Sequence, residues 1–479
     1  MVFSSPLFIF LFLPLVLFFT LILTPGKYRN HTLLFFSLLF YAWGELSYTL
    51  VMIVSIALTY LFGLWIGSSS SAKYAKIALG VTIAANLSLL VYFKYAEFIV
   101  QNINYLLVDF GIEKIKVSKI HLPIGISFFT FHSLSYCIDV YRKGVKAQRS
   151  LVNVALYITL FPQLVAGPII RYHDIADQLQ KRIFSARQFM EGVRRFIAGL
   201  AKKVLVANTM ASIADQIFEI NSVNLGVEVA WLGIIAYTLQ IYFDFSGYSD
   251  MAIGLGKMFG FDFLENFNYP YIARSIKEFW RRWHISLSNW FRDYLYIPLG
   301  GNKIGKARTY ANLLFVFFIT GLWHGASWNF IFWGMWHGFY LVIERLGMDK
   351  VLAKCWKPVT HIYTMLVVMI GWVYFRAENF EAGTLYVKSL FGINRLLKTP
   401  FELELYLTNE NIVTLIVAII FSTPIIKKIL DKEKEVGADP SWKKTFIPIS
   451  ESVLLLAVFI LSLSYLASGT YNPFIYFRF

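Results

Sequence analysis

The chain is short of charged residues and of cysteines, and these two shortages exclude several classes of protein. Charged residues make up 15% of the 479 residues, whereas a soluble domain usually carries about 25%. No hydrophilic block is long enough to form even one soluble domain. Cys137 and Cys355 are too few and too far apart for a disulfide framework or a thiolate metal site. The composition therefore predicts a single membrane domain over residues 1–479.

Several motifs of well-known catalytic sites are also missing. The sequence contains no His-Glu-x-x-His zinc helix, no Gly-x-Ser-x-Gly nucleophile elbow, no phosphate loop and no dinucleotide fingerprint. We therefore expect no metal site and no bound cofactor. We also expect no covalent mechanism that uses a serine of this chain.

Long apolar runs take the place of the missing polar sequence. Hydrophobic residues make up 57% of the chain, and the mean hydropathy is +0.58. The first run, Pro6 to Thr24, has no basic residue before it and no small-residue cleavage site, which favours a retained helix over a secretory signal. Similar runs recur along the chain and predict an all-α polytopic membrane protein with about 11 crossings. Runs near 122–140, 151–167 and 310–323 contain Pro, Gly or polar residues and are predicted to be re-entrant segments.

The net charge of +15 is concentrated in the links between apolar runs. Such basic links are typical of loops on the cytoplasmic side of a membrane, and they attract anionic lipids of the bilayer. This distribution argues against nucleic acid as a partner. We expect Arg182 and Lys434 to face the cytoplasm, and the N-terminus to face outward because no Lys or Arg precedes Lys27. The basic links are Arg142 to Arg149, Lys181 to Lys203, Arg274 to Arg308, and Lys427 to Lys444.

Three of the eight histidines lie in one aromatic-rich region of the sequence. His284 follows Phe-Trp-Arg-Arg-Trp, His324 lies in Gly-Leu-Trp-His-Gly-Ala, and His337 lies in Trp-Gly-Met-Trp-His-Gly. Ionisable groups inside apolar spans are costly to keep, so they are candidate site residues. Imidazole also has an unperturbed pKa near neutrality, which suits a general base.

Each histidine also has a purely structural interpretation, because histidine beside tryptophan is typical of the interfacial aromatic belt. That interpretation is favoured for His337. For His324, the small residues Gly321 and Gly325 are expected to open space beside the ring, and the sequence alone leaves both interpretations open. His284 is equally open, because a polar sequence follows it.

Two carboxylates lie where another apolar run ends. Asp244 and Asp250 belong to the sequence Tyr-Phe-Asp-Phe-Ser-Gly-Tyr-Ser-Asp, which ends at Asp250. This sequence fits the wall of a polar tunnel, and it fits equally well a helix break with solvated carboxylates.

Seven motifs, in this order along nearly the whole chain, are similar to those of bacterial membrane-bound O-acyltransferases. The resemblance is greatest to the branch that acetylates alginate and peptidoglycan. The motifs are Leu122–Phe128, Phe161–Ile169, Phe243–Asp250, Phe279–Ser286, Gly321–Ala326, Gly371–Ala377 and Tyr471–Phe479.

The resemblance implies a ring of tilted helices around a tunnel, with His324 as the catalytic base and His284 at a second polar position. It implies that acetyl from cytoplasmic acetyl-CoA, a substrate rather than a bound cofactor, crosses a bacterial inner membrane. A serine hydrolase-like (SGNH) partner outside would place the acetyl group on a cell-surface polysaccharide, alginate-type first and peptidoglycan second. The residues assigned to the tunnel or the substrate site are Trp323, Asn289, Ser286, Arg281, Asp244 and His337.

Two alternatives stay open at this point. One is a D-alanyl transferase for teichoic acid, which would have the same fold. The other is a polysaccharide transporter without chemistry, although the sequence has no evident paired broken helices or coupling-ion site.

Overall fold

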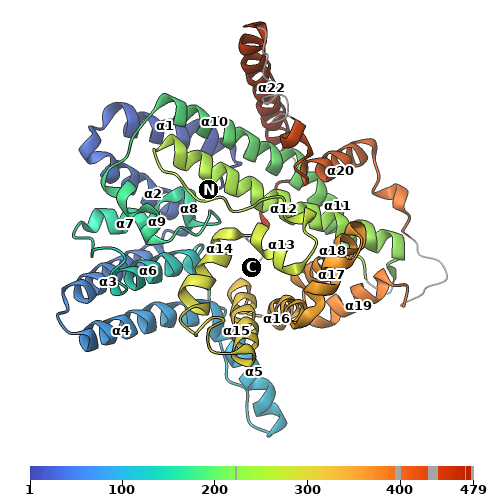
Figure 1. Cartoon of the computed structure of the whole chain (residues 1–479), viewed down its shortest axis with the longest axis horizontal. Helices are drawn as coiled ribbons and strands as arrows, with labels where there is room; N and C mark the ends of the chain where they lie inside the picture. The colour runs from blue at the N-terminus through green and yellow to red at the C-terminus, as the bar shows by residue number, and fades with distance from the viewer. Residues whose placement is uncertain (222–223, 394–400, 430–440, 470, 476–479) are drawn as a thin grey trace. The chain divides into compact units, whose positions relative to one another are not determined.

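The chain is helical throughout its described part, which holds no strand (Figure 1). The computed structural model describes residues 1–221, 224–393, 401–429, 441–469 and 471–475. Lys434 and the last four residues of the terminal motif lie outside these ranges. The helices gather into two compact units. Helices α10 and α12 contribute residues to both units.

The first unit comprises Met1–Val193 and Ala252–Leu264. Serine side chains begin two of its helices, because Ser71 accepts a hydrogen bond from the backbone of Lys73 and Ser150 accepts one from Asn153. Its helices are η1 (Phe8–Phe12), α1 (Leu13–Leu17), η2 (Phe18–Leu23), η3 (Gly26–Tyr28), α2 (Arg29–Glu45), α3 (Thr49–Ser68), α4 (Ala72–Leu90), η4 (Val91–Tyr95), α5 (Ala96–Asp109), α6 (Ile126–Tyr141), α7 (Leu151–Thr159), α8 (Phe161–Leu164), α9 (Tyr172–Gln180) and the start of α10 (Ala186–Ala201).

The second unit comprises Arg194–Met251 and Glu265–Phe479. It contains all three histidines of the aromatic-rich region. Its helices are η5 (Lys202–Ala207), α11 (Asn208–Phe218), α12 (Val227–Met258), η7 (Pro270–Ile272), α13 (Ile276–Arg282), α14 (Ile285–Phe291), η8 (Arg292–Tyr296), α15 (Lys306–His324), α16 (Trp328–Ile343), η9 (Glu344–Met348), α17 (Asp349–Lys354), α18 (Lys357–Arg376), α19 (Phe380–Leu390), η10 (Leu403–Leu405), α20 (Asn409–Phe421) and α22 (Ser441–Ala467).

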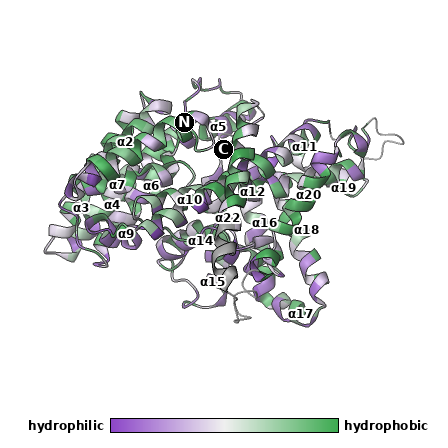
Figure 2. Cartoon of the chain, turned by 90° about the horizontal axis from the view of Figure 1, so that it is seen from above, coloured by the Kyte–Doolittle hydropathy of each residue, from purple (hydrophilic) through white to green (hydrophobic). Residues whose placement is uncertain are grey.

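Six helical stretches in the described residues are long and apolar enough to cross a membrane. Figure 2 shows apolar residues in green along α3 and α12, and hydrophilic residues in purple on α17. Two shorter apolar helices, Phe8–Leu23 and Asn409–Phe421, accompany them. The all-helical membrane architecture is therefore confirmed, whereas the count of 11 crossings stays a prediction. The six stretches are Thr49–Ser68, Ala72–Asp109, Ala186–Phe218, Val227–Met258, Lys357–Arg376 and Ser450–Ala467.

The segments predicted to be re-entrant differ from one another. The run at 151–167 breaks after Thr159, and the short helix α8 begins at Phe161 with Pro162 in its first turn. The run at 310–323 is instead part of α15, which is unbroken from Lys306 to His324. Proline explains the first break, because it lacks the N–H that a continuing helix needs.

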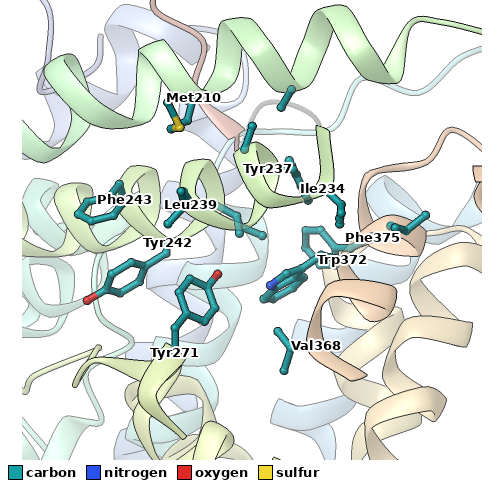
Figure 3. Packing of buried hydrophobic residues seen from close by; sticks show 14 of the residues in the cluster. Met210, Ile234, Tyr237, Leu239, Tyr242, Phe243, Tyr271, Val368, Trp372 and Phe375 are labelled. Atoms are coloured by element: carbon teal, nitrogen blue, oxygen red, sulfur yellow. The ribbon is translucent and has the colours of Figure 1, made fainter. Parts of the chain in front are cut away.

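The core of the second unit contains many aromatic side chains among its aliphatic ones (Figure 3). The Tyr271 hydroxyl donates to the carbonyl of Thr238 over 2.6 Å, which ties η7 to the middle of α12. Trp372 of α18 lies 4.9 Å from the ring of Trp283, between ring centroids. Large rings of this kind each bury roughly 150–250 Å². The core therefore holds the segment that contains His284 against α12 and α18.

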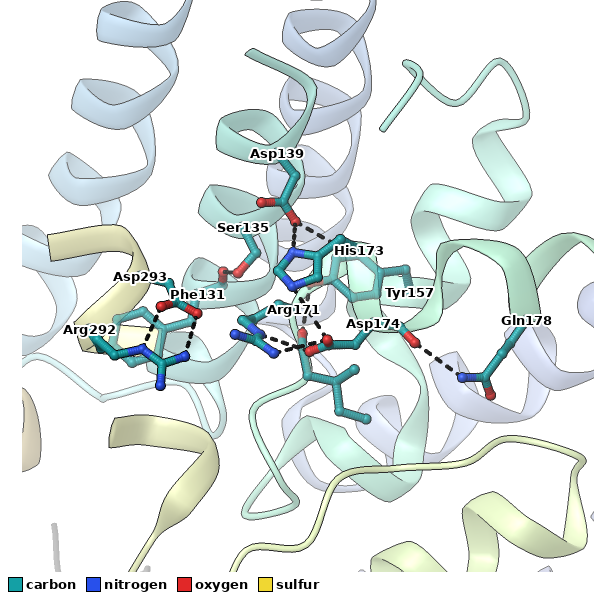
Figure 4. A network of polar contacts seen from close by, with 11 residues as sticks. Phe131, Ser135, Asp139, Tyr157, Arg171, His173, Asp174, Gln178, Arg292 and Asp293 are labelled. Atoms are coloured by element: carbon teal, nitrogen blue, oxygen red, sulfur yellow. Dashed lines mark hydrogen bonds and ion pairs between the residues drawn. The ribbon is translucent and has the colours of Figure 1, made fainter. Parts of the chain in front are cut away.

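A polar network in the first unit fixes the start of α9 (Figure 4). The Asp139 carboxylate accepts from the backbone N–H of His173 over 3.1 Å and from its Nδ1 over 2.9 Å. This hydrogen bond raises the pKa of His173 above its ordinary value. Arg171 and Asp174 form an ion pair of 2.8 Å beside it. The network gives the link between α8 and α9 a fixed path.

Candidate active site

His324 is the last residue of α15 and is buried among aromatic rings. Its ring centroid lies 4.9 Å from that of Trp333 and 5.2 Å from that of Phe375. The imidazole faces a small cavity of about 20 Å³, which has room for roughly one water molecule. The residues that line this cavity are Ile241, Phe245, Trp283, His324, Trp333, Trp372, Phe375 and Ile475. A small polar group can therefore reach His324 in otherwise apolar surroundings.

His284 is fully buried between α13 and α14, and its ring is held through one nitrogen. Nδ1 lies 3.1 Å from Oδ1 of Asn266, which can only accept, so Nδ1 carries the proton. The same Oδ1 accepts from the backbone and the hydroxyl of Ser286, over 3.2 and 2.9 Å. Nε2 is buried and has no partner in the described part of the chain. Burial lowers the pKa of His284 to about 3, so the imidazole is neutral.

Trp323 lies between the two histidines. Its ring centroid is 4.7 Å from that of His324 and 6.3 Å from that of His284. Phe245 also joins them, because it lines the His324 cavity and lies 4.6 Å from the His284 ring. The structure thus brings His284, Trp323 and His324 into one site from residues 40 positions apart in the sequence.

The two glycines near His324, Gly321 and Gly325, both pack against Phe330. A Cβ on Gly321 would lie 2.3 Å from the carbonyl oxygen of Phe330, and one on Gly325 would lie 2.2 Å from the Phe330 ring. The space beside Gly321 is therefore filled by α16 rather than left open, whereas Gly325 also lines a wider pocket next to the site. Gly321 lets the backbones of α15 and α16 approach closely, as small residues do in membrane helix pairs, and Gly325 leaves room for the Phe330 ring.

A wider pocket of about 950 Å³ adjoins the site. Gly325 and Ala326, directly after His324, line it together with the polar side chains of Asn329 and Arg376. Phe375 and Ile475 line both this pocket and the small cavity, so these two side chains separate them.

The wall that contains Ile475 is held by buried charges. Asp244 forms an ion pair of 2.8 Å with Lys203, and both side chains are almost fully buried. The Asp244 carboxylate also accepts from the backbone N–H of Ile475 over 3.0 Å, and Lys203 donates to the carbonyl of Pro473. Tyr471 donates to Asp215 over 2.6 Å. Asp244 thus anchors residues 471–475, and it does not line the cavity or the wider pocket.

The remaining residues predicted for the site are scattered. His337 of α16 is fully buried, 5.2 Å from the Trp280 ring and 5.3 Å from the Trp333 ring, which fits the structural interpretation. Ser286 supports Asn266. Arg281 is exposed on α13, and Asn289 is half-buried on α14. Neither of the last two lines the cavity or the wider pocket.

Three other residues that shape the site carry no clear signal in the sequence. Asn266 orients His284, and Trp333 lines the cavity with an indole N–H that has no acceptor in the described residues. Glu344 accepts from the backbone N–H groups of Ile276 and Lys277 over 2.6 and 3.0 Å, and so holds the start of α13. For Asn266, the only signal in the sequence was its polar side chain within Leu-Glu-Asn-Phe-Asn.

Comparison with known proteins identifies the family. The model of the membrane-bound O-acyltransferase family matches residues 37–381. The chain is 42% identical to the probable alginate O-acetylase AlgI of Azotobacter vinelandii over the full length of both proteins. It is 34% identical to the peptidoglycan O-acetyltransferase of Helicobacter pylori, over 89% of this chain and 87% of that protein. A teichoic acid D-alanyltransferase of Streptococcus thermophilus is 31% identical over 47% of this chain and 58% of its own length. The chain therefore belongs to the membrane-bound O-acyltransferase family and is a multi-pass membrane acyltransferase.

Proposed function

We propose that the chain acts as one O-acetyltransferase domain that moves acetyl from cytoplasmic acetyl-CoA toward an exported polysaccharide. The observation that carries this proposal is the position of His324, in a small apolar cavity beside a wide pocket that both polar and apolar side chains line. Alginate-type polymers are the first choice of acceptor, because the probable alginate O-acetylase of Azotobacter vinelandii matches along its whole length. Peptidoglycan is the second choice.

His324 acts as the general base in the proposed reaction. It takes the proton of the attacking hydroxyl while the hydroxyl oxygen bonds to the thioester carbonyl carbon. The carbon–sulfur bond then breaks and the thiolate of CoA leaves. The proton stays on His324, which is then an imidazolium. General base catalysis contributes about 10²- to 10⁴-fold. The indole N–H of Trp333 is the best placed donor for the oxyanion, and one such donor is often worth about 3 kcal/mol.

Charge sets the direction of transfer. Lys306 begins α15 and Arg345 follows α16, and basic residues at these ends favour the cytoplasmic side. The opposite ends of the same helices, next to Gly325 and Arg376, then open outward with the wider pocket. We infer that acetyl-CoA approaches from the cytoplasm of a bacterial inner membrane. An SGNH partner on the outer side receives the acetyl group and places it on the polysaccharide.

His324→Gln tests the proposal, because glutamine keeps the size and hydrogen bonding of the side chain without its basicity. We expect acetate incorporation into surface polysaccharide to fall by roughly 100-fold or more at matched membrane levels. His361→Gln is the matched control and should retain activity, because His361 is half-buried on α18 and lies outside the cavity.

Two outcomes would contradict the proposal. Substantial acetylation by the His324→Gln protein would remove the general base role. D-alanine rather than acetate on the surface polymers of cells that express the wild-type chain would instead support the teichoic acid alternative.

A further inference from the structure

A basic pocket of about 1260 Å³ lies in the first unit, far along the sequence from the histidine site. The ends of α2, α3, α6 and α7 surround it, together with the link between α6 and α7. Lys27, Lys143, Lys146 and Arg149 line it, and none of its described lining residues is acidic. These four cations form no ion pair within the described residues. The pocket is thus a concentration of positive charge without a protein counter-ion.

The pocket wall is built on a fixed polar scaffold. The Asn30 amide donates to Asn153 Oδ1 and to the carbonyl of Leu179, both over 2.8 Å. Arg182 in turn donates to Asn30 Oδ1 over 2.6 Å. Because Asn30 and Asn153 line the pocket, this scaffold holds its floor in place.

Two further arginines stand behind this wall. The guanidinium groups of Arg29 and Arg182 lie 4.3 and 5.8 Å from the centre of the Phe184 ring. The Nε atoms of both are buried and have no hydrogen-bond acceptor in the described part of the chain. Burial, with a smaller effect of Arg29, lowers the pKa of Arg182 to about 10. The positive charges of Arg29 and Arg182 repel each other, and an anion in the pocket next to them relieves this repulsion.

The surroundings of the pocket indicate which anion fits. Exposed aromatic and apolar side chains belong to α3, the helix whose end lines the pocket: Trp65 is 41% exposed, and Leu61 is 59% exposed. Leu64 of the same helix lines the pocket itself. By contrast, no Phe, Tyr or Trp is among the described lining residues, so an adenine ring would find no platform to stack on.

We propose that this pocket binds the phosphate headgroup of an anionic phospholipid of the cytoplasmic leaflet. Lys143, Lys146 and Arg149 hold the phosphate, and the acyl chains follow the apolar surface of α3. Basic pockets between membrane helices on the cytoplasmic side recognise such headgroups. A nucleotide phosphate, as in CoA, has the same charge chemistry and is the competing source that the experiment must separate.

The test uses the purified full-length protein in phosphatidylcholine nanodiscs with increasing fractions of cardiolipin or phosphatidylglycerol. Lipid retention is measured by native mass spectrometry, and stability by the thermal unfolding midpoint. One surface cation contributes about 1 kcal/mol of attraction to anionic lipid, or roughly fivefold in affinity. The triple variant Lys143→Gln/Lys146→Gln/Arg149→Gln should therefore lose about 100-fold in affinity and most of the lipid-dependent rise in midpoint.

Matched controls separate a site from general charge. The variant Lys114→Gln/Lys116→Gln/Lys119→Gln loses three exposed cations outside the pocket and should bind the lipids as the wild type does. Lys146→Glu is the second pocket variant, in case the triple variant unfolds. Free 3′,5′-adenosine bisphosphate is added as the soluble phosphate probe.

Three results would overturn the proposal. Unchanged lipid affinity in both pocket variants would exclude the site. Equal losses of lipid affinity in the pocket and control variants would show that the affinity depends on net charge and not on this pocket. Protection by 3′,5′-adenosine bisphosphate that depends on Lys143 and Lys146, without retention of anionic lipid, would assign the pocket to a nucleotide.

Discussion

The backbone of His284 has a left-handed conformation, with φ of 44° and ψ of 54°. This conformation costs most L-residues roughly 1–2 kcal/mol, whereas Asn adopts it more readily because its short amide bonds locally. The same backbone directs Nδ1 toward Asn266. A residue at this position must therefore tolerate the left-handed region and donate one hydrogen bond.

His284→Asn should consequently keep measurable acetyl transfer, and more of it than His284→Ala. Asparagine suits the backbone and its amide can donate to Asn266 Oδ1. Alanine removes this hydrogen bond at about 0.5–1.5 kcal/mol, although the two donors of Ser286 still satisfy the oxygen. Acetate incorporation at matched membrane levels measures the difference. Equal loss in the two variants would mean that His284 carries a proton or a charge that asparagine cannot supply.

The lowered pKa of His284 gives this position a defined pH dependence. The folded pKa is about 3 against an ordinary value of 6.5, so below pH 6.5 the unfolded chain binds a proton that the folded chain does not. Stability is therefore lost as pH falls from 6.5 toward 3. Between about pH 7 and 5, the unfolding midpoint of a folded His284→Asn protein should fall less than that of the wild type. A larger fall in the variant would contradict a neutral His284.

Lys277 and Arg281 are exposed cations one helical turn apart on α13, outside both the cavity and the wider pocket. Their position suits attraction of anionic acetyl-CoA better than a role at the reacting carbon. Lys277→Gln/Arg281→Gln should raise the KM for acetyl-CoA and leave kcat nearly unchanged, with an effect that weakens as salt rises. Steady-state kinetics at two ionic strengths measure this. A fall in kcat at constant KM would place the pair at the reacting centre.

The role of a single residue was predicted from the sequence where it depends on the residue's own chemistry. It was missed where it depends on a partner far away in the sequence. His324 and His284 stood out because ionisable groups are rare in apolar surroundings. Asp244 stood out for the same reason, but its partner Lys203 and the segment at Ile475 lie on other elements. The motif around Asp244 holds no pattern that predicts its ion pair with Lys203 or its hydrogen bond to Ile475.

At the scale of helices, the hairpin of α15 and α16 positions the site. Its two helices lie side by side, and His324 ends the first while Trp333 belongs to the second (Figure 1). Gly334 lies at their contact, where a Cβ would come within 2.2 Å of the carbonyl oxygen of Phe317. Backbone atoms cannot yield as a flexible side chain can, so the contact requires glycine.

Gly334→Ala should therefore push the helices apart, lower the amount of folded protein in the membrane, and reduce activity per folded molecule. Overpacking of this kind typically costs about 1–3 kcal/mol. Gly80→Ala is the matched control, because Gly80 is also helical and no other residue has an atom within 4 Å of the place that the added methyl group would take. Fluorescence size-exclusion chromatography after heating compares the two. Equal melting of both variants would show that the contact does not limit stability.

Apolar runs predicted most of the helices, because length and hydropathy are local properties of a membrane helix. Their breaks and contacts were harder to predict. The run at 151–167 does break, just before Pro162, whereas the run at 310–323 lies in α15, which stays unbroken despite the Thr and Gly residues near its end. Helix-breaking tendencies of such residues are overridden when a neighbouring helix packs against them, and that neighbour is not visible in the run itself.

At the scale of the molecule, one helical stretch is long and apolar enough to reach from one face of the membrane to the other. Ala186–Phe218 is 33 residues long, with Arg187 exposed near its start and Glu219 exposed just after its end. The basic links predict that the Arg187 end faces the cytoplasm. Arg182, predicted from the sequence to lie on this side, packs on Phe184 and Phe261 and is a poorer probe.

Cysteine labelling of intact cells tests this orientation. In a Cys355→Ser background, since Cys355 is the exposed native thiol, an impermeant maleimide should label Glu219→Cys and fail to label Arg187→Cys. Permeabilised cells should label both. Labelling of Arg187→Cys from outside would reverse the direction in which the wider pocket opens.

The tether between Asp244 and Ile475 also has a consequence for how the protein is made. The two residues are 231 positions apart, and at about 5–20 residues per second a ribosome needs roughly 12–46 s to translate that distance. During this interval α12 is already available to the membrane, while the segment that completes the wall beside His324 has not yet been synthesised. Until then the Asp244 carboxylate can pair with Lys203 but not with the N–H of Ile475. Phe375 is the last of the other cavity-lining residues to be made, and Ile475 follows it by 100 positions. The nascent enzyme is thus expected to spend roughly 5–20 s with the cavity beside His324 open on the Ile475 side.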